Sequence, residues 1–155
     1  MDADGSTSIR HVDAFMEACH RGSDVIIGSR KIRNAFIEVY QPVARRLMGN
    51  MGNWLIRMIL GLWSYPDTQC GFKMLSEYAA RDIAERLTID RFGFDFELLV
   101  IAENFGFEIK QLPVRWQNKK VSSVNFSGPN GFMQVLLDLL KTRWQLEKGL
   151  YDREP

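Results

Sequence analysis

The chain of 155 residues is long enough to enclose one hydrophobic core, and a composition of 46% hydrophobic and 25% charged residues excludes a disordered chain. The formal net charge of +1 excludes a strong overall electrostatic field, so we expect no nucleic-acid partner. Cys19 and Cys70 form neither a metal-binding pattern nor a disulfide framework, and we expect them to be free thiols in a reducing compartment.

The first part of the chain predicts an alternation of helix and strand. Ser8 is placed to cap a helix that runs to residue 21, where Gly22 is a plausible stop. The apolar run at 24–28 predicts a short buried strand. Residues 31–40 show no periodic pattern, and we expect an irregular loop there.

A longer amphipathic helix is predicted over residues 42–62. Its apolar stretch is interrupted by Asn50, Asn53 and Arg57, so we expect no transmembrane span. The remaining pattern predicts a strand at 70–75, helices at 76–86 and 94–105, a strand at 107–116, a polar loop at 117–130 and a last amphipathic helix at 131–148. This order of short strands and helices predicts a single α/β domain.

Asp2 and Asp4 lie in a loop rich in Gly, Ser and Thr. Side chains two residues apart in an extended loop point the same way, so these carboxylates can converge on one Mg²⁺ or Mn²⁺ ion. Two alternatives remain open. The acids can simply form a solvated turn, or Asp-x-Asp-Gly-Ser can open an aspartyl-phosphate phosphatase with Asp2 as nucleophile, although no Asp-Asp pair follows downstream.

Two further motifs suit a phosphate or sugar ligand. Arg30 follows the strand at 24–28, where a planar guanidinium can bind a phosphate or can simply face solvent in a turn. The segment from Asp67 to Lys73 combines an acid, the amide of Gln69, a glycine and a base within seven residues. Glycine permits close approach to a ligand, but the same composition also suits a turn before a strand.

Two later motifs are each open to two interpretations. Asp95 and Glu97 begin a helix, where acids either complement the helix dipole or line an acceptor site. Arg115 and Trp116 precede a polar loop that suits a lipid headgroup and its phosphate, or that is simply solvated. The polar residues of that loop include Lys119, Lys120 and Ser123.

Taken together and in this order, the motifs resemble those of family-2 glycosyltransferases with the GT-A fold. The resemblance is strongest to the dolichyl-phosphate glucosyl- and mannosyltransferases and their bacterial polyprenyl-phosphate relatives, and it extends from Asp2 to about Trp144. It implies that residues 1–155 form the C-terminal half of a GT-A domain, with an incomplete sheet and amphipathic helices. We expect the N-terminal nucleotide-binding half to be missing.

The resemblance also implies roles for individual residues. Asp2 and Asp4 would bind the metal, and Arg30 and Arg45 would bind the acceptor phosphate, although Gly49 stands where many relatives carry a serine. The implied catalytic residues are Asp67, Gln69, Asp95 and Glu97. The other implied substrate-binding residues are Lys73, Arg115, Lys119, Lys120 and Ser123.

The implied reaction is inverting transfer of a hexose from UDP-glucose or GDP-mannose to a polyprenyl or dolichyl phosphate. The acceptor phosphate is already ionised at neutral pH, so no strong general base is required. We expect a peripheral protein on the cytoplasmic face of a membrane, inactive without the other half and prone to self-association through exposed apolar surface. The alternative is a non-catalytic module that binds a membrane or subunit through the helices at 42–62 and 131–148.

Overall fold

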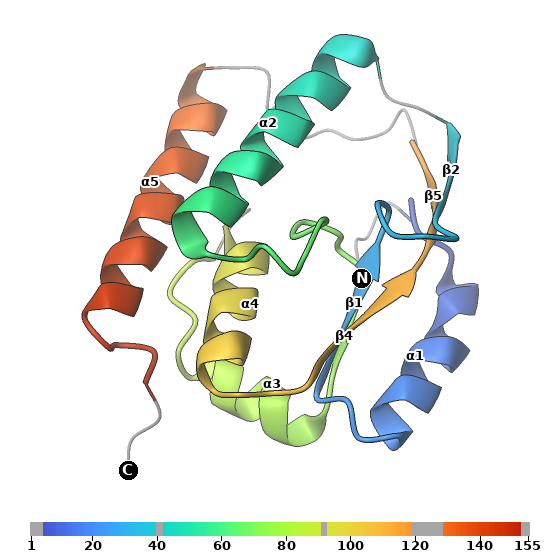
Figure 1. The fold of residues 1–155 in the computed structure, drawn as a ribbon, viewed down its shortest axis with the longest axis horizontal. Helices are drawn as coiled ribbons and strands as arrows, with labels where there is room; N and C mark the ends of the chain where they lie inside the picture. Colours follow the sequence, from blue (N-terminus) through green and yellow to red (C-terminus); the bar gives the residue numbers. More distant parts are fainter. Residues whose placement is uncertain (1–4, 40–41, 91–92, 119–128, 153–155) are drawn as a thin grey trace.

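The computed structural model describes residues 5–39, 42–90, 93–118 and 129–152 (Figure 1). Its elements in chain order are the 3₁₀ turn η1 (Ile9–His11), α1 (Val12–His20), β1 (Val25–Ser29), β2 (Phe36–Val39), α2 (Val43–Leu60), β3 (Lys73–Leu75), α3 (Glu77–Ala84), α4 (Phe94–Asn104), β4 (Ile109–Pro113), β5 (Arg115–Gln117) and α5 (Pro129–Glu147). The predicted α/β class is confirmed.

The described strands form two small sheets. The first has the order β3-β1-β4, in which β1 is antiparallel to β3 and parallel to β4. The second contains β2 and β5, paired in parallel. The central strand β1 is buried along its whole length, so the first sheet is covered on both faces.

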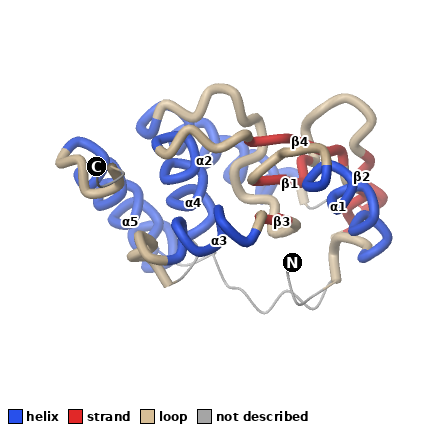
Figure 2. The backbone as a smooth tube through the Cα atoms, turned by 90° about the horizontal axis from the view of Figure 1, so that it is seen from below, coloured by secondary structure: helices blue, strands red, loops and turns tan. Residues whose placement is uncertain are grey.

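Helices cover the two faces of β1 unequally. Side chains alternate between the faces of a strand. Val25 and Ile27 therefore join the larger core, which contains residues from α2, α3, α4 and α5, whereas Ile26 packs with Phe15 of α1 in a smaller core. Figures 1 and 2 show α1 on one side of β1 and β4, and α2, α4 and α5 on the other.

The helix α4 lies at the centre of the larger core, because every residue from Phe96 to Ala102 is buried. The helices α2 and α5 contact each other and lie outside α4 (Figure 2). Both carry large apolar side chains that remain exposed, which are Val43, Leu47, Met48, Met51, Trp54 and Met58 on α2, and Met133, Leu137, Leu140 and Trp144 on α5. Within the described ranges, no helix has the length and hydropathy of a membrane span.

Two sequence-based expectations about strands are wrong. The predicted loop at 31–40 contains β2, and the predicted strand at 107–116 is divided into β4 and β5. The division occurs at buried Val114, whose N–H donates to the carbonyl of Ser29 and whose carbonyl accepts the N–H of Phe36. The chain thus changes its pairing partner there from β1 to β2, a long-range effect that no local pattern reveals.

Candidate functional site

The centre of the candidate site is an ion pair between Arg30, which directly follows β1, and Asp67 in the turn before β3. The Nε and Nη2 atoms of Arg30 donate to the two carboxylate oxygens of Asp67, each at 2.7 Å, and the backbone N–H of Arg30 donates at 2.9 Å. Asp67 is only 1% exposed, whereas the Arg30 side chain is 26% exposed. The pair therefore fixes the orientation of the Arg30 guanidinium, while part of this side chain remains accessible to solvent.

The charges around Asp67 have an excess of positive sign. Burial alone would raise the pKa of Asp67, but the hydrogen bonds and charge of Arg30 outweigh burial and hold the pKa below its usual range. Lys31 has a pKa lowered by desolvation and by the charges of Arg30 and Arg57, with Asp67 opposing. Arg30 and Lys31 thus place positive charge next to one carboxylate, and Arg57 adds positive charge near Lys31, an arrangement that favours an anionic ligand. Lys31 is not among the site residues predicted from the sequence.

Gly28 explains why the turn before β3 approaches the end of β1 so closely. Its N–H donates to the carbonyl of Phe72 at 2.7 Å. A Cβ atom at this position would lie 2.9 Å from Cγ1 of Val114 and 3.0 Å from both Sγ of Cys70 and the Phe72 carbonyl oxygen. A distance of 2.9 Å is shorter than real Cβ contacts and 3.0 Å is tighter than most of them, so a side chain here would require movement of Val114 or of the segment that carries Asp67.

Asn53 of α2 holds the same turn from the opposite side. Its Nδ2 donates to the carbonyl of Pro66 at 3.0 Å, and its Oδ1 accepts the N–H and the hydroxyl of Thr68 at 3.2 and 3.0 Å. In the sequence alone, Asn53 is visible only as an interruption of an apolar stretch. The available signal was its spacing of three and seven residues from Ile56 and Leu60, which places an amide on the buried face of the helix.

A second ion pair joins the end of the same segment to the start of α4. Lys73 donates to Asp95 and, at 2.7 Å, to the carbonyl of Cys70. Its side chain is 6% exposed and that of Asp95 is 15% exposed. The segment from Asp67 to Lys73 is therefore connected to β1 by its first residue and to α4 by its last.

Glu97 does not join Asp95, although both lie in the first turns of α4. Its carboxylate is fully buried and accepts hydrogen bonds from the hydroxyl of Thr88 at 2.7 Å, the N–H of Ile89 at 2.9 Å and the hydroxyl of Tyr151 at 2.6 Å. These partners connect the residues before α4 to the C-terminal turn. The catalytic role of Glu97 stays a prediction, and its position is that of an internal polar anchor.

The other predicted site residues are more dispersed. Gln69 is half-buried in the turn between the two ion pairs, and Arg45 is exposed on α2. The guanidinium of Arg115 lies 5.5 Å from the ring centre of Phe36, and Arg30 lies 5.6 Å from that of Trp116. Asp2, Asp4, Lys119, Lys120 and Ser123 lie outside the described residues, so their roles stay predictions.

A hollow of about 420 Å³ begins at Gly5, directly after the predicted metal-binding acids. It is lined by residues of the N-terminal segment and of β5, including His11, Arg115 and Trp116. The N–H of Arg115 donates to Nε2 of His11 at 2.9 Å, and partial burial together with the charge of Arg115 lowers the pKa of His11. In the described parts of the chain, no three His, Cys, Asp or Glu side chains form a metal-binding group. The metal site at Asp2 and Asp4 stays a prediction.

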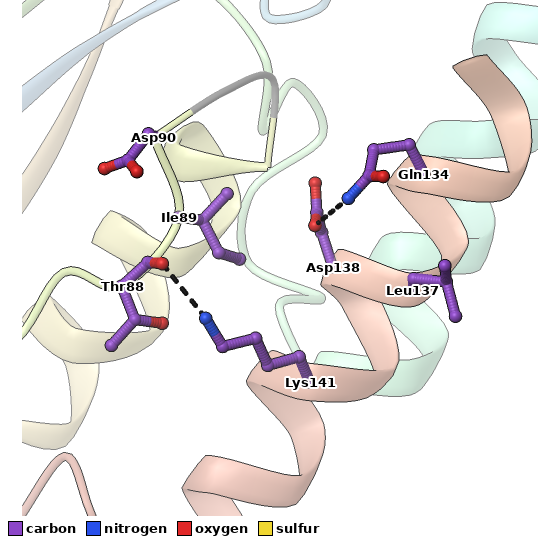
Figure 3. Close-up of a pocket in the computed structure, with 7 residues that line it drawn as sticks. All are labelled: Thr88, Ile89, Asp90, Gln134, Leu137, Asp138 and Lys141. Carbon is purple, nitrogen blue, oxygen red and sulfur yellow. Dashed lines mark hydrogen bonds between the residues drawn. The ribbon is translucent and has the colours of Figure 1, made fainter. Parts of the chain in front are cut away.

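A second hollow, of about 440 Å³, lies between residues 88–90 and α5 (Figure 3). Lys141 donates across it to the carbonyl of Thr88 at 3.0 Å, and Gln134 donates to Asp138 at 2.9 Å. Of the predicted site residues that the structure describes, none lines this hollow. The candidate site is therefore assigned to the two ion pairs and not to this cavity.

Several known proteins are similar to this chain over most of its length. No protein-family model matches the chain. It is 28% identical to a dolichyl-phosphate beta-glucosyltransferase of Trichomonas vaginalis over an alignment of 156 positions, which covers 97% of this chain and 45% of the relative. Proteins of the same name are 31% identical in Drosophila melanogaster, over 74% of this chain and 37% of the relative, and 28% identical in Saccharomyces cerevisiae, over 97% and 48%.

The chain spans less than half the length of each of these relatives. The alignments with the Trichomonas and Saccharomyces proteins nevertheless cover most of the present chain. The resemblance predicted from the motifs is therefore confirmed, and the α/β structure is consistent with part of a GT-A-like fold. By this resemblance, the chain is a homologue of the glycosyltransferases named dolichyl-phosphate beta-glucosyltransferase.

Proposed function

We propose that the protein transfers glucose from a nucleotide sugar to dolichyl phosphate or a related polyprenyl phosphate, and that this chain supplies the acceptor side. The observation that carries the proposal is the connection of the Asp67–Lys73 segment to β1 through Arg30 and to α4 through Asp95. The names of the relatives favour glucose, and hence UDP-glucose over GDP-mannose, as the donor.

The acceptor phosphate binds, in this proposal, at the accessible part of Arg30. Lys31 adds positive charge near the same carboxylate, and Arg57 adds positive charge near Lys31, so a phosphate there meets a net positive field. Because Asp67 already fixes the guanidinium, little reorganisation is required when the anion binds. Arg45, Arg115, Lys119, Lys120 and Ser123 are proposed to surround the remainder of the acceptor.

The reaction follows from this placement. An ionised phosphate oxygen of the acceptor attacks the anomeric carbon of glucose, and the bond from that carbon to the nucleoside diphosphate breaks in line with the attack. Such a displacement inverts the anomeric configuration, so an α-linked donor gives a β-linked lipid sugar. Positioning provides most of the acceleration. A Mg²⁺ or Mn²⁺ ion held by Asp2 and Asp4, whose oxygen donors suit a hard cation, would stabilise the leaving diphosphate.

The outer faces of α2 and α5 support a peripheral position on the cytoplasmic face of a membrane. Leu47, Met51 and Trp54 are each more than half exposed, and the exposed basic residues Arg45 and Arg46 lie on the same helix. Apolar side chains flanked by cations are typical of helices that lie in a lipid interface. The same faces also support a second candidate function, a non-catalytic module that binds a membrane, a subunit or another copy of the chain.

A transfer assay tests the proposal. The complete gene product, incubated with radiolabelled UDP-glucose, Mn²⁺ and dolichyl phosphate in mixed micelles, should form labelled lipid. Arg30→Ala should reduce transfer by roughly 100-fold, because the guanidinium that is proposed to bind the acceptor phosphate is lost. Arg21→Ala, which removes an arginine from an exposed pair with Glu17, is the matched control and should leave transfer unchanged. Lipid binding without sugar-nucleotide binding or transfer would instead favour the non-catalytic module.

A further inference from the structure

We infer that Asn53 is a positioning residue, which couples the location of α2 to the orientation of Arg30 through the turn that contains Asp67. The inference rests on the proposed function for its consequence in catalysis, but the coupling itself concerns described contacts only. Asn53 is 5% exposed, and its hydrogen bonds in the described structure are to Pro66 and Thr68 and not to Arg30 or Asp67. Its effect on an acceptor would therefore act through Asp67.

The contacts form a continuous chain from the helix to the arginine. Asn53 bonds to the residue before Asp67 and to the residue after it, through Pro66 and Thr68. Asp67 is thereby fixed between two anchored neighbours, with its carboxylate directed at Arg30. A displacement of Asn53 must either break these bonds or move the carboxylate that orients the guanidinium.

The two faces of α2 indicate how this coupling would serve the proposed function. The buried face carries Asn53, Ile56 and Leu60, whereas the nearby Met51 and Trp54 are 59% and 52% exposed. The surface proposed to meet lipid and the residue that holds the Asp67 turn therefore lie on one rigid helix. Seating α2 at a membrane would set the Arg30 site at a defined depth for the phosphate of a lipid acceptor.

Asparagine suits this position because the turn requires both a donor and an acceptor. The amide nitrogen binds the Pro66 carbonyl, and the amide oxygen accepts both groups of Thr68. Alanine removes all three bonds. Aspartate keeps acceptor oxygens for Thr68, but it cannot donate to Pro66 and it buries an unpaired charge beside the Asp67 turn, so Asn53→Asp should disturb the turn at least as much as Asn53→Ala.

The coupling can be measured without enzymatic activity, from hydrogen exchange at the Arg30 Nε–H group by NMR. Loss of the hydrogen bonds that hold the Asp67 turn should increase the exchange rate roughly tenfold in Asn53→Ala, and at least as much in Asn53→Asp. Asn50→Ala, at an exposed position on the same helix, is the matched control and should leave the rate unchanged. Wild-type exchange in a folded Asn53→Ala or Asn53→Asp variant would overturn the inference.

Steady-state kinetics of the complete gene product then separate positioning from general stability. Asn53→Ala should raise KM for the polyprenyl phosphate about tenfold and leave KM for the sugar nucleotide unchanged. In an Asp67→Asn background, the same change should have little further effect, because both act through Arg30. Equal changes in both KM values, or additive effects, would overturn the positioning role. Absence of transfer by the wild type would instead contradict the proposed function, while the exchange measurement would still test the coupling.

Discussion

At Asp67, one buried carboxylate is stabilised by bonds from a single arginine, and these bonds are the most consequential contacts of the site. Asp67→Asn leaves Arg30 without its ionic partner and should reduce the free energy of unfolding by roughly 2–4 kcal/mol in urea titrations. Glu17→Gln removes an exposed partner of Arg21 and should change it by less than about 0.5 kcal/mol. Equal, small effects of the two substitutions would show that the Arg30–Asp67 pair does not organise the turn.

Gly28 and Gly49 provide a second test at the residue scale. A Cβ at Gly28 would contact Val114, Cys70 and Phe72, so Gly28→Ala should destabilise the protein by about 1–3 kcal/mol. A Cβ at Gly49 meets no atom within 4 Å, and alanine favours a helix, so Gly49→Ala should stabilise by up to about 1 kcal/mol. Thermal unfolding of both variants gives the comparison. A neutral Gly28→Ala would contradict the close approach of the Asp67–Lys73 segment to β1.

At the scale of the elements, the outer face of α2 is expected to bind lipid. Leu47→Ser removes an apolar side chain that is 62% exposed and should lower the affinity for vesicles containing phosphatidylglycerol by roughly tenfold in a flotation assay. Ile9→Ser, which changes a side chain that is 58% exposed in η1, is the matched control. Equal loss of binding in both variants would indicate non-specific hydrophobic adsorption to the vesicles and not a membrane-binding face.

Helices were predictable from the sequence because their signals are local. Ser76 caps α3 through a bond to Ala79, and Gly61 ends α2 in the left-handed conformation, with φ of 79°. The strands were less predictable, because β2 at Phe36–Val39 exists only through pairing with β5. Local composition cannot reveal a partner almost eighty residues away in the sequence, and for this reason β2 was predicted as a loop.

The residues of the candidate site show the same contrast between local signals and long-range contacts. Arg30, Asp67, Lys73 and Asp95 were all selected from motifs, but their pairing is a product of the fold, in which Arg30 and Asp67 are brought together across 37 positions. Asn53 was missed because its function depends on the backbone of a distant turn. Glu97 was grouped with Asp95 by sequence proximity, although its carboxylate is directed to the opposite side of α4, toward Thr88 and Tyr151.

At the scale of the whole molecule, the lowered pKa of His11 predicts how the free energy of unfolding depends on pH. The pKa of His11 is lowered from its ordinary value of 6.5, so the folded state binds the proton more weakly than the unfolded state. Its contribution to stability is present above pH 6.5 and is lost as the pH falls through the lowered pKa. His11→Gln should flatten this part of a curve of melting temperature against pH. An unchanged slope below pH 6.5 would show that the bond from the Arg115 N–H to His11 does not contribute.

The central claim is that Arg30, oriented by Asp67, receives the phosphate of a lipid acceptor. Calorimetric titration of the chain with farnesyl phosphate, a short polyprenyl phosphate, tests it most directly. Binding should require the phosphate, so the affinity for farnesol should be roughly tenfold lower than that for farnesyl phosphate. Arg30→Ala should lower the affinity for farnesyl phosphate by a comparable factor. Equal affinity for farnesol and farnesyl phosphate, unaffected by Arg30→Ala, would contradict the account.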